Sequence, residues 1–486
     1  MTDGRAGYEP VIGVEIHVQL ATATKMFCGC EQSFGDPVNT HTCPVCLGHP
    51  GALPVTNARA IELAILAGHA LGCTVAPRST FHRKNYFYPD LPKAYQISQF
   101  DEPVCLGGEF VALTPDGELR VKITRAHLEE DAAKLVHAGS DGRRAGAESS
   151  IVDFNRGGTP LLEIVTEPDL RSAADAVTFL KQLRSTLRQL GISDCNMEEG
   201  SMRADANVSV RPVGSEQLGV KTELKNMNSF RFLERGIEAE IDRQVAILED
   251  GGTITQETLH YDHDSGALHT LRSKEEAHDY RYFPEPDLVP VVPDPAWVER
   301  LGEGLPELPV DRRRRWMGEL GIGFEDAEVL SESLELAAYF EDVAARSDPQ
   351  AAANWVRGEL RAQLRERGEE PWDSQVTPER LVGLLELLAA RAINVPAAKE
   401  VLAELIERGG DAAAIVEAKG LGQITDESEL EELVARLIAD NPDQVQQLRD
   451  GKEKVLGFFV GQAMKATEGR ADPKRVGELV RERAGL

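Results

Sequence analysis

Residues 11–20 read VIGVEIHVQL, and their alternating pattern decides how the first half of the chain is interpreted. Alternation of apolar and polar side chains over this length predicts a half-buried β-strand. The apolar side of that strand carries Val14, Ile16 and Val18. The polar side presents Glu15 and His17, about 7 Å apart along one face of a strand. A carboxylate and an imidazole so placed suit metal coordination or acid–base chemistry, and the simpler alternative is a solvated polar face.

The length and charge of the chain restrict the possible classes of protein. A chain of 486 residues exceeds what one hydrophobic core supports, so two or three domains are expected. A net charge of −28 argues against a broad nucleic-acid-binding surface, so a nucleic acid must meet a local basic patch or a partner protein. The sequence has no apolar run of membrane-spanning length and no signal-peptide or transit-peptide pattern, which predicts a cytoplasmic protein without a membrane partner.

Four of the seven cysteines form two closely spaced pairs. The pairs are Cys28-x-Cys30 and Cys43-x-x-Cys46. Four thiolates on two short loops suit a tetrahedral zinc ion with a structural role. An odd number of cysteines in a cytoplasmic chain makes disulfides unexpected, and the alternative to zinc is four buried thiols without a metal.

Two further segments concentrate reactive side chains. Residues 82–98, HRKNYFYPDLPKAYQIS, mix aromatic residues, charges and two prolines, which predicts an ordered functional loop rather than a regular strand. The consecutive acids Glu129, Glu130 and Asp131 either begin a solvated helix or hold a divalent cation, which prefers oxygen ligands.

Later segments repeat the combination of extended backbone and charged side chains. Glu163 is a lone carboxylate within an apolar predicted strand, residues 162–166. Because an unpaired carboxylate is costly to bury, Glu163 is either a metal ligand or the ionic partner of Arg203 or a nearby lysine. Strict alternation places Arg203 and Asp205 on one face of another strand, and residues 220–225 alternate in the same way. Together these strands predict an antiparallel sheet whose polar side lines a site for phosphates and a metal.

The predicted fold class is α+β, with strands confined to the first part of the chain. Helices are expected at 57–72, 172–190 and 230–249. Prolines between 284 and 293 suggest a boundary, and from residue 306 onward the apolar residues show only helical spacing. We therefore predict a mainly antiparallel sheet with flanking helices, then an all-α domain and a small all-α tail. The predicted domains are residues 1–295, 296–409 and 410–486.

The tail differs in charge from the rest of the chain. Residues 441–486 contain nine basic and seven acidic residues, a net charge of +2 (9 − 7). This makes the tail the best electrostatic candidate for contact with a nucleic acid. The sequence contains no GxxxxGK[ST], GxSxG or GxGxxG motif, so any use of ATP would not involve a standard phosphate loop.

Long strings of the sequence resemble one known family, the B subunits of the aspartyl/glutamyl-tRNA(Asn/Gln) amidotransferases. The strings from the first part of the chain are GVEIHVQL, CPVCLGHPGALPV, HRKNYFYPDLPKAYQIS, LEEDAAKL, VDFNRGGTPLLEIVTEPD, CNMEEGSMRADANVSVRP and ELKNMNSF. NWVRGEL follows in the helical part, and LGFFVGQAMKATEGRADP in the tail is shared with YqeY-like domains. One departure is Ala133, where the family usually has glycine.

The resemblance implies a catalytic cradle domain, a helical domain and a YqeY-like tRNA-binding tail. It implies ATP-dependent conversion of mischarged Glu-tRNA(Gln), Asp-tRNA(Asn) or both to Gln-tRNA(Gln) and Asn-tRNA(Asn). ATP would phosphorylate the side-chain carboxylate of the amino acid, and ammonia would displace the phosphate. Ammonia would come from the amidase (A) subunit of a heterotrimer that also contains a small (C) subunit. The implied cofactors are ATP, Mg²⁺ and a structural Zn²⁺.

The resemblance also assigns roles to residues of this sequence. It places the magnesium ligands on His17, Glu130 and Glu163, with Glu15 and Glu129 beside them. The full catalytic set expected on this basis is Glu15, His17, Glu129, Glu130, Glu163, Arg203 and Asp205. Lys84, Tyr86 and Lys93 match positions near the entry of the ammonia tunnel.

Two alternatives to this interpretation remain. The first is a zinc-stabilised scaffold that binds tRNA without chemistry of its own, which leaves the buried carboxylates unexplained. The second is an archaeal relative that acts only on Glu-tRNA(Gln), which carries an extra domain for which this chain has no room. The choice between the two tRNA substrates stays open.

Overall fold

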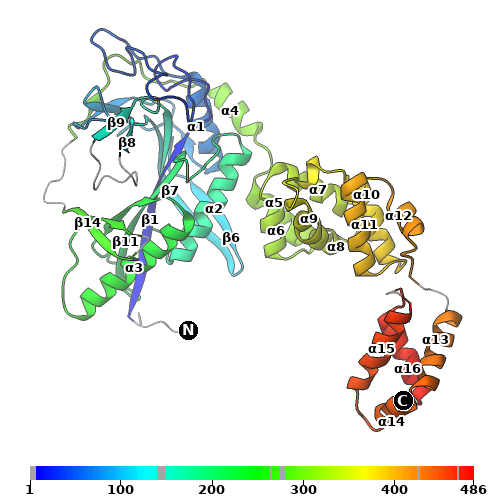
Figure 1. Ribbon diagram of the computed structural model, residues 1–486. Coiled ribbons are helices and arrows are strands. Elements are labelled where there is room, and N and C mark those ends of the chain that lie inside the picture. Colours follow the sequence, from blue (N-terminus) through cyan, green and yellow to red (C-terminus); the bar gives the residue numbers. More distant parts are fainter. Residues whose placement is uncertain (1–6, 139–148, 263–264, 274–279, 424–426, 468–469) are drawn as a thin grey trace. The chain divides into compact units, whose positions relative to one another are not determined.

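The computed structural model describes residues 7–138, 149–262, 265–273, 280–423, 427–467 and 470–486 (Figure 1). The chain divides into two compact units, Met1–Arg312 and Arg313–Leu486. The first unit combines β-sheets with helices, and the described part of the second unit is helical. The predicted α+β fold class is therefore confirmed. None of the described helices is long and apolar enough to cross a membrane.

A ten-stranded sheet forms the centre of the first unit. Its strands are β1 (Tyr8–Gln19), β2 (Thr74–Val75), β5 (Cys105–Leu106), β6 (Glu109–Thr114), β7 (Gly117–Glu130), β10 (Pro160–Thr166), β11 (Met202–Pro212), β12 (Thr222–Met227), β13 (Glu257–Tyr261) and β14 (Leu268–Ser273). Their order is β14-β13-β12-β11-β1-β10-β7-β5-β2, and β6 pairs with β7. Among these described strands only β12 and β13 pair in parallel, so the sheet is mainly antiparallel, as predicted.

Strand β1 lies between β10 and β11, so both of its edges pair with neighbouring strands in the middle of the sheet. Val14, Ile16 and Val18 are buried in the main hydrophobic core. That core also takes the apolar sides of α1 (Ala58–Ala70), α2 (Ala173–Gln189) and α3 (Phe230–Glu249). The alternation of β1 thereby leaves its polar side chains on the opposite face of the sheet.

The three predicted helices of the first unit are present, and their first residues explain where they begin. Asn57 accepts hydrogen bonds from the backbone N–H groups of Arg59 and Ala60 at the start of α1. Ser172 and Ser229 cap α2 and α3 in the same way. A cap of this kind stabilises a helix by about 1 kcal/mol, because it satisfies an N–H group that has no partner within the helix.

The prediction of a loop over residues 82–98 is wrong at both ends of the segment. Its ends form β3 (His82–Asn85) and β4 (Tyr95–Ser98), which pair with each other, and β3 also pairs with β15 (Phe283–Pro284). The two prolines lie in the connection between the strands, where no ladder hydrogen bond is required of them. Two further strands, β8 (Lys134–Ala138) and β9 (Ser149–Asp153), pair with each other in a separate antiparallel sheet.

The helices that follow the sheet begin before the boundary between the two units. The first is α4 (Pro295–Glu303), where the backbone oxygen of Val298 lies 2.9 Å from His69 Nε2 on α1. The first compact unit therefore extends beyond the predicted boundary at residue 295. The next helix, α5 (Pro309–Arg315), contains the boundary between the units.

The described residues of the second unit form two separate hydrophobic cores. Buried residues between Trp316 and Ala412 form one core, and buried residues between Leu430 and Ala484 form the other. Helix α12 contributes Ala412 to the first of these cores, so that core extends past residue 409. The helices of the first core are η1 (Trp316–Leu320), α6 (Phe324–Leu330), α7 (Leu334–Ala344), α8 (Pro349–Asn354), η2 (Trp355–Leu360), α9 (Arg361–Arg365), η3 (Pro371–Asp373), α10 (Pro378–Ala389), α11 (Val395–Arg408) and α12 (Ala412–Lys419). Those of the second are α13 (Glu427–Asp440), α14 (Pro442–Arg449), α15 (Lys454–Ala466) and α16 (Pro473–Ala484).

Candidate functional site

Four charged or imidazole side chains form a row across the middle of the ten-stranded sheet. His17 on β1 is paired in register with Arg203 on β11 and with Glu163 on β10, and Glu163 is paired with His127 on β7. Directly paired residues of antiparallel strands point to the same face. Four consecutive strands thus present Arg203, His17, Glu163 and His127 side by side, opposite the core.

Glu163 lies between the two imidazoles of this row. Its Oε2 atom is 3.3 Å from His17 Nε2 and 3.4 Å from His127 Nε2. Glu129 approaches from β7, with Oε1 3.7 Å from His17 Nε2 and Oε2 3.9 Å from His127 Nε2. Ser98 Oγ donates a hydrogen bond of 3.2 Å to Glu129 Oε2. We refer to His17, His127, Glu129 and Glu163 as the carboxylate–imidazole cluster.

Three members of the cluster offer atoms in an arrangement that suits a divalent cation. One ligand atom from each of His17, Glu129 and Glu163 lies within 4.8 Å of the other two. Two carboxylates provide the oxygen ligands that Mg²⁺ prefers, and Mg²⁺ usually keeps several water ligands of its own. Imidazole is a less usual ligand for Mg²⁺ than for the transition metals, although the donor set as a whole fits the ion.

Glu130 lies on the other side of the sheet from Glu129. Consecutive side chains of a strand point to opposite faces, and both glutamates belong to the buried end of β7. The Glu130 carboxylate forms an ion pair with Lys93 and accepts a 3.0 Å hydrogen bond from the backbone N–H of Ile97. The structure therefore places Glu129, and not Glu130, beside His17 and Glu163. The alternative of a solvated helix start is wrong for these acids.

Electrostatics within the cluster favour charged forms of both partners in the metal-free protein. Burial opposes the charge on His17, but the hydrogen bond to Glu163 and the nearby carboxylate charges raise the pKa of His17 to about 9. Burial likewise opposes the charge on Glu163, and the charges and hydrogen bonds of His127 and His17 hold the pKa of Glu163 well below its usual value. A cation entering the cluster would replace the proton of His17.

Arg203 is paired with an acid from outside the cluster. Its Nη2 atom lies 3.1 Å from Asp131 Oδ1, and Gln19 Nε2 donates to Asp131 Oδ2 at 3.0 Å. Burial of Asp131 disfavours its charged form, yet the guanidinium groups of Arg203 and Arg156 lower the pKa of that carboxyl. The predicted alternative, an ion pair between Glu163 and Arg203, is absent among the described contacts, where the ionic partners of Glu163 are His17 and His127.

The remaining predicted catalytic residues extend the polar face along β1 and β11. Glu15 and Asp205 are paired in register, two residues along the strands from His17 and Arg203. Glu15 Oε1 accepts a 2.9 Å hydrogen bond from Asn207, and Asp205 Oδ2 lies 2.8 Å from Lys225 Nζ. Neither residue contacts the carboxylate–imidazole cluster in the described structure, so both lie beside the cluster and not within it.

The three residues expected near the ammonia tunnel occupy different sides of the site. Lys84 Nζ lies 5.1 Å from the centroid of the Tyr280 ring; burial lowers the pKa of Lys84, but the charges of Glu129 and other acidic groups raise it overall. The ring of Tyr86 contacts the ring of Tyr280, with centroids 6.0 Å apart. Lys93 lies on the other side of β7, against Glu130.

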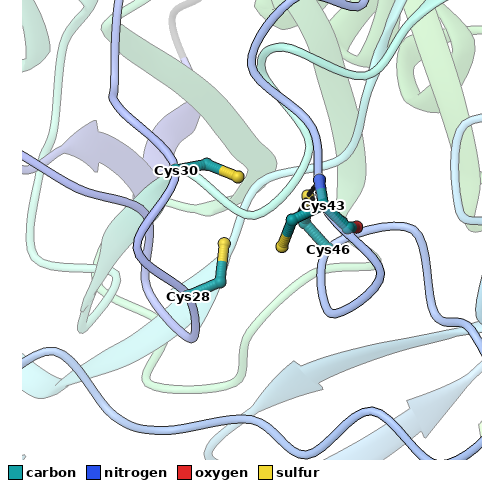
Figure 2. A group of neighbouring side chains, drawn as sticks. All are labelled: Cys28, Cys30, Cys43 and Cys46. Atoms are coloured by element: carbon teal, nitrogen blue, oxygen red, sulfur yellow. Dashed lines mark hydrogen bonds between the residues drawn. The ribbon is translucent and has the colours of Figure 1, made fainter.

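The four paired cysteines converge, as Figure 2 shows. Their sulfur atoms all lie within 4.8 Å of one another, and the sulfurs of Cys43 and Cys46 are 3.9 Å apart. Zinc–sulfur bonds of about 2.3 Å in a tetrahedron separate neighbouring sulfurs by about 3.8 Å, so the group fits one zinc ion. We refer to Cys28, Cys30, Cys43 and Cys46 as the cysteine cluster; it could bind a metal such as zinc.

A buried lysine supports the cysteine cluster. Lys25 is 1% exposed, and its Nζ atom donates to the backbone oxygens of His41 and Phe154 at 2.8 and 2.9 Å. The same atom lies 3.8 Å from Cys46 Sγ. A hydrogen bond from Cys28 and the positive charge of Lys25 lower the pKa of Cys46, so this sulfur is favoured as a thiolate even without metal.

The sequence interpretation missed His127, and it considered Asp131 only as one of three consecutive acids that could hold a divalent cation, not as the partner of Arg203. One signal for His127 was available, since His127 and Glu129 repeat the spacing of Glu15 and His17 on the opening strand. For Asp131 no such signal exists, because its partners Gln19 and Arg203 come from strands distant in sequence. A cavity of about 420 Å³ adjoins these residues, with Gln19, Arg156 and Ser201 in its lining.

Comparison with known proteins connects these features to one family. Residues 10–299 match the family model described as the GatB/GatE catalytic domain, and residues 338–483 match the model of the GatB domain. The chain is 52% identical over 474 residues to a protein of Geotalea daltonii, covering 97% of this chain and 98% of that protein. It is also 52% identical over 478 residues to a protein of Moorella thermoacetica, covering 98% and 99% of the two chains. Both relatives are named as the B subunit of an aspartyl/glutamyl-tRNA(Asn/Gln) amidotransferase.

Proposed function

The chain belongs to the family of amidotransferase B subunits, and from this premise we propose that it catalyses the ATP-dependent transamidation of mischarged tRNA. As a member of this family it is one component of a carbon–nitrogen ligase. The substrates in the proposal are Glu-tRNA(Gln), Asp-tRNA(Asn) or both. The side-chain carboxylate of the mischarged amino acid takes the γ-phosphoryl group of ATP, and ammonia then displaces phosphate from the acyl phosphate.

One observation carries the proposal: two carboxylates and two imidazoles meet on one face of the central sheet, with an arginine beside them. Phosphoryl transfer depends mainly on positioning and on neutralising the phosphate charge. Mg²⁺ bound by His17, Glu129 and Glu163 would supply that neutralisation. His127 holds the Glu163 carboxylate alongside His17, which fixes its orientation.

Cationic side chains around the cluster support the handling of anionic groups. Lys84 places an ammonium next to Glu129, where it is available to pair with a phosphate oxygen. Arg203 is held by Asp131, which also binds Gln19 in the lining of the cavity of about 420 Å³. We assign this cavity to the aminoacyl end of the tRNA.

The proposal assigns the ammonia to partner proteins. The sequence contains no GxSxG motif or other recognised amidase signature, so the amidase subunit would release ammonia from glutamine and the small subunit would complete the heterotrimer. Lys84, Tyr86 and Lys93 are the residues we propose along the path of ammonia. A scaffold without chemistry would account for the cysteine cluster and the tail, but it offers no reason to bury Glu129 and Glu163 beside two imidazoles.

The decisive experiment removes one carboxylate from the cluster. Glu163→Gln keeps the shape of the side chain and loses its charge, so transition-state stabilisation should fall by several kcal/mol, on the order of 100-fold or more in rate. The assay follows ATP-dependent phosphate release by the assembled complex with mischarged tRNA and without glutamine. The matched control is Glu240→Gln, which removes a buried carboxylate from α3, where it contacts Thr222 and Arg243. Near-normal phosphate release by Glu163→Gln would make that carboxylate structural.

A second experiment tests the role of the tail in tRNA binding. The core of residues 430–484 is separate from the preceding core, so deletion of residues 427–486 leaves the rest of the second unit with its own core. We expect the truncated complex to bind mischarged tRNA more weakly and to hydrolyse glutamine normally. Unchanged affinity for the tRNA would remove the tail from the binding surface.

A further inference from the structure

The turn that follows the second cysteine pair contacts Lys93. Gly48 has φ +67°, and a Cβ atom added to it would overlap Lys93 Cγ. Backbone hydrogen bonds hold the turn in place: the N–H of Leu47 donates to the oxygen of Cys43, and the N–H of Gly48 donates to that of Val45, each at 3.0 Å. This turn is therefore hydrogen-bonded to Cys43, a member of the cysteine cluster, and to Val45, which lies between Cys43 and Cys46.

On its other side, Lys93 is fixed by a buried ion pair with Glu130. The two side chains are 10% and 5% exposed. Glu130 also accepts a hydrogen bond from the N–H of Ile97, so its carboxylate does not follow Lys93 freely. Glu130 follows Glu129 on β7, but consecutive side chains of a strand point to opposite faces, so this ion pair lies on the other side of the sheet from the carboxylate–imidazole cluster.

The cysteine cluster and this ion pair line the same small cavity. A cavity of about 60 Å³ separates them, lined by Cys46, Gly48, Lys93 and Glu130 among others. At Gly158, which has φ +87°, an added Cβ would lie 3.6 Å from Cys46 Cβ and 3.9 Å from Glu130 Oε2. Gly158 therefore lies near both Cys46 and Glu130, and the tight approach between the cysteine loop and the ion pair is that of Gly48 to Lys93.

We propose that the cysteine cluster, through the turn at Gly48, holds Lys93 in position against Glu130. Gly48 is thus a positioning residue, and the metal in the cysteine cluster has a role in amide formation beyond general stability. The inference rests on the proposed function for the step that it names. Displacement of Lys93 should slow the transfer of ammonia and leave phosphoryl transfer, on the opposite face of β7, largely unaffected.

The first test compares two glycine variants that both have a positive φ. Gly48 and Gly51 both have positive φ, +67° and +82°, but an alanine Cβ at Gly51 meets nothing within 4 Å. We expect Gly48→Ala to release zinc to a chelator at least about fivefold faster than Gly51→Ala, the lower end of usual coupling between sites. The measurement is the rate of zinc release from the purified complex, followed with a coloured chelator. Equal release rates for the two variants would overturn the proposal.

The second test asks whether Lys93 is the side chain through which Gly48 acts. Lys93→Ala removes the Cγ atom that the new methyl group would overlap. In a double-mutant cycle, Lys93→Ala should therefore suppress most of the effect of Gly48→Ala on zinc release, which is the non-additivity expected of residues in contact. Additive effects would show that Gly48 acts through another neighbour. If Gly48→Ala fails to fold, a folded double variant supports the proposal, and a double variant that also fails to fold overturns it.

The third test asks whether the coupling between Gly48 and Lys93 affects phosphoryl transfer or the later formation of the amide. Gly48→Ala should keep phosphate release near that of Gly51→Ala and form glutaminyl- or asparaginyl-tRNA more slowly from glutamine. Equal slowing of both steps would contradict the specific role in amide formation. If the unsubstituted complex releases no phosphate with mischarged tRNA, the proposed function fails, while the zinc-release comparison still decides the coupling by itself.

Discussion

The cysteine cluster and the carboxylate–imidazole cluster are both compact groups of metal ligands, but different levels of structure assemble them. The cysteines come from two loops within nineteen consecutive positions, residues 28–46, and their spacing alone brings the sulfurs together. The second cluster takes its members from β1, β7 and β10, and more than a hundred residues of chain separate β1 from β10. Its geometry depends on the register of the sheet.

This difference has a consequence for what each cluster tolerates. A loop-borne site is held by its own metal and by local hydrogen bonds, so loss of the metal removes much of its support. A sheet-borne site is positioned by the ladder of β1, β10 and β7 and by the core beneath it, so its ligands stay in place without a metal. We therefore expect substitutions in the first cluster to affect folding and substitutions in the second to affect ligand binding.

Replacing one cysteine of the cluster should have the largest effect on stability. Loss of a metal belongs to the few changes that exceed the usual cost of a point substitution, so Cys43→Ser should lower the free energy of unfolding by more than about 3 kcal/mol. Cys73→Ser is the matched control, because it makes the same chemical change outside the cluster. Urea unfolding of the two variants, with zinc content measured in parallel, checks this. A zinc-free Cys43→Ser protein as stable as the control would show that the loops need no metal.

Substituting each of the two adjacent glutamates of β7 should show which face of the sheet binds the divalent cation. Glu129 and Glu130 are 2% and 3% exposed, so they differ in the face they occupy and not in burial. We expect Glu129→Gln to weaken the binding of Mn²⁺, used as a spectroscopic substitute for Mg²⁺, by about 100-fold, or about 2.7 kcal/mol. Glu130→Gln should leave this affinity nearly unchanged. If Glu130→Gln weakened Mn²⁺ binding more than Glu129→Gln did, Glu130 would be a ligand of the cation, as the family resemblance implied.

The two glutamates also show how far the sequence alone could lead. Alternation identified β1, β11 and β12, and local helix signals identified α1, α2 and α3, because these patterns lie within or next to each element. The cysteine cluster was predictable for the same reason. Whether Glu129 or Glu130 faces His17 depends on the register between β7, β10 and β1, and no local pattern specifies that register.

Two other features were beyond local patterns. The connection between strands β3 and β4 contains two prolines. These prolines led to the prediction of a loop over the whole segment, although they lie outside both strands. The ion pair of Arg203 with Asp131 joins positions 72 residues apart, and only the folded sheet brings them within 3.1 Å. Contacts of this kind follow from tertiary packing, which competes with local preference and often overrides it.

The pH dependence of metal binding is the most specific test of His17. The raised pKa of His17, about 9 against 6.5 in an ordinary histidine, means that its imidazole carries a proton at pH 7 in the metal-free protein. An imidazole binds a metal only in its neutral form, so binding releases this proton, and the dissociation constant for Mn²⁺ should fall by about tenfold per pH unit from pH 7 to 9. Above pH 9 the dissociation constant should level off.

The raised pKa of His17 affects the stability of the metal-free protein in the opposite direction: metal binding tightens as the pH rises, whereas the fold becomes less stable. A folded-state pKa above the unfolded value stabilises the fold fully below pH 6.5, and this contribution is lost as the pH rises through 9. Metal binding should therefore tighten over the window in which the metal-free protein becomes less stable. His17→Gln should flatten the dependence of metal binding on pH, because it removes the titrating group. A dissociation constant that stays constant between pH 7 and 9 in the unsubstituted protein would exclude His17 as a ligand, and the cation would then depend on Glu129 and Glu163 alone.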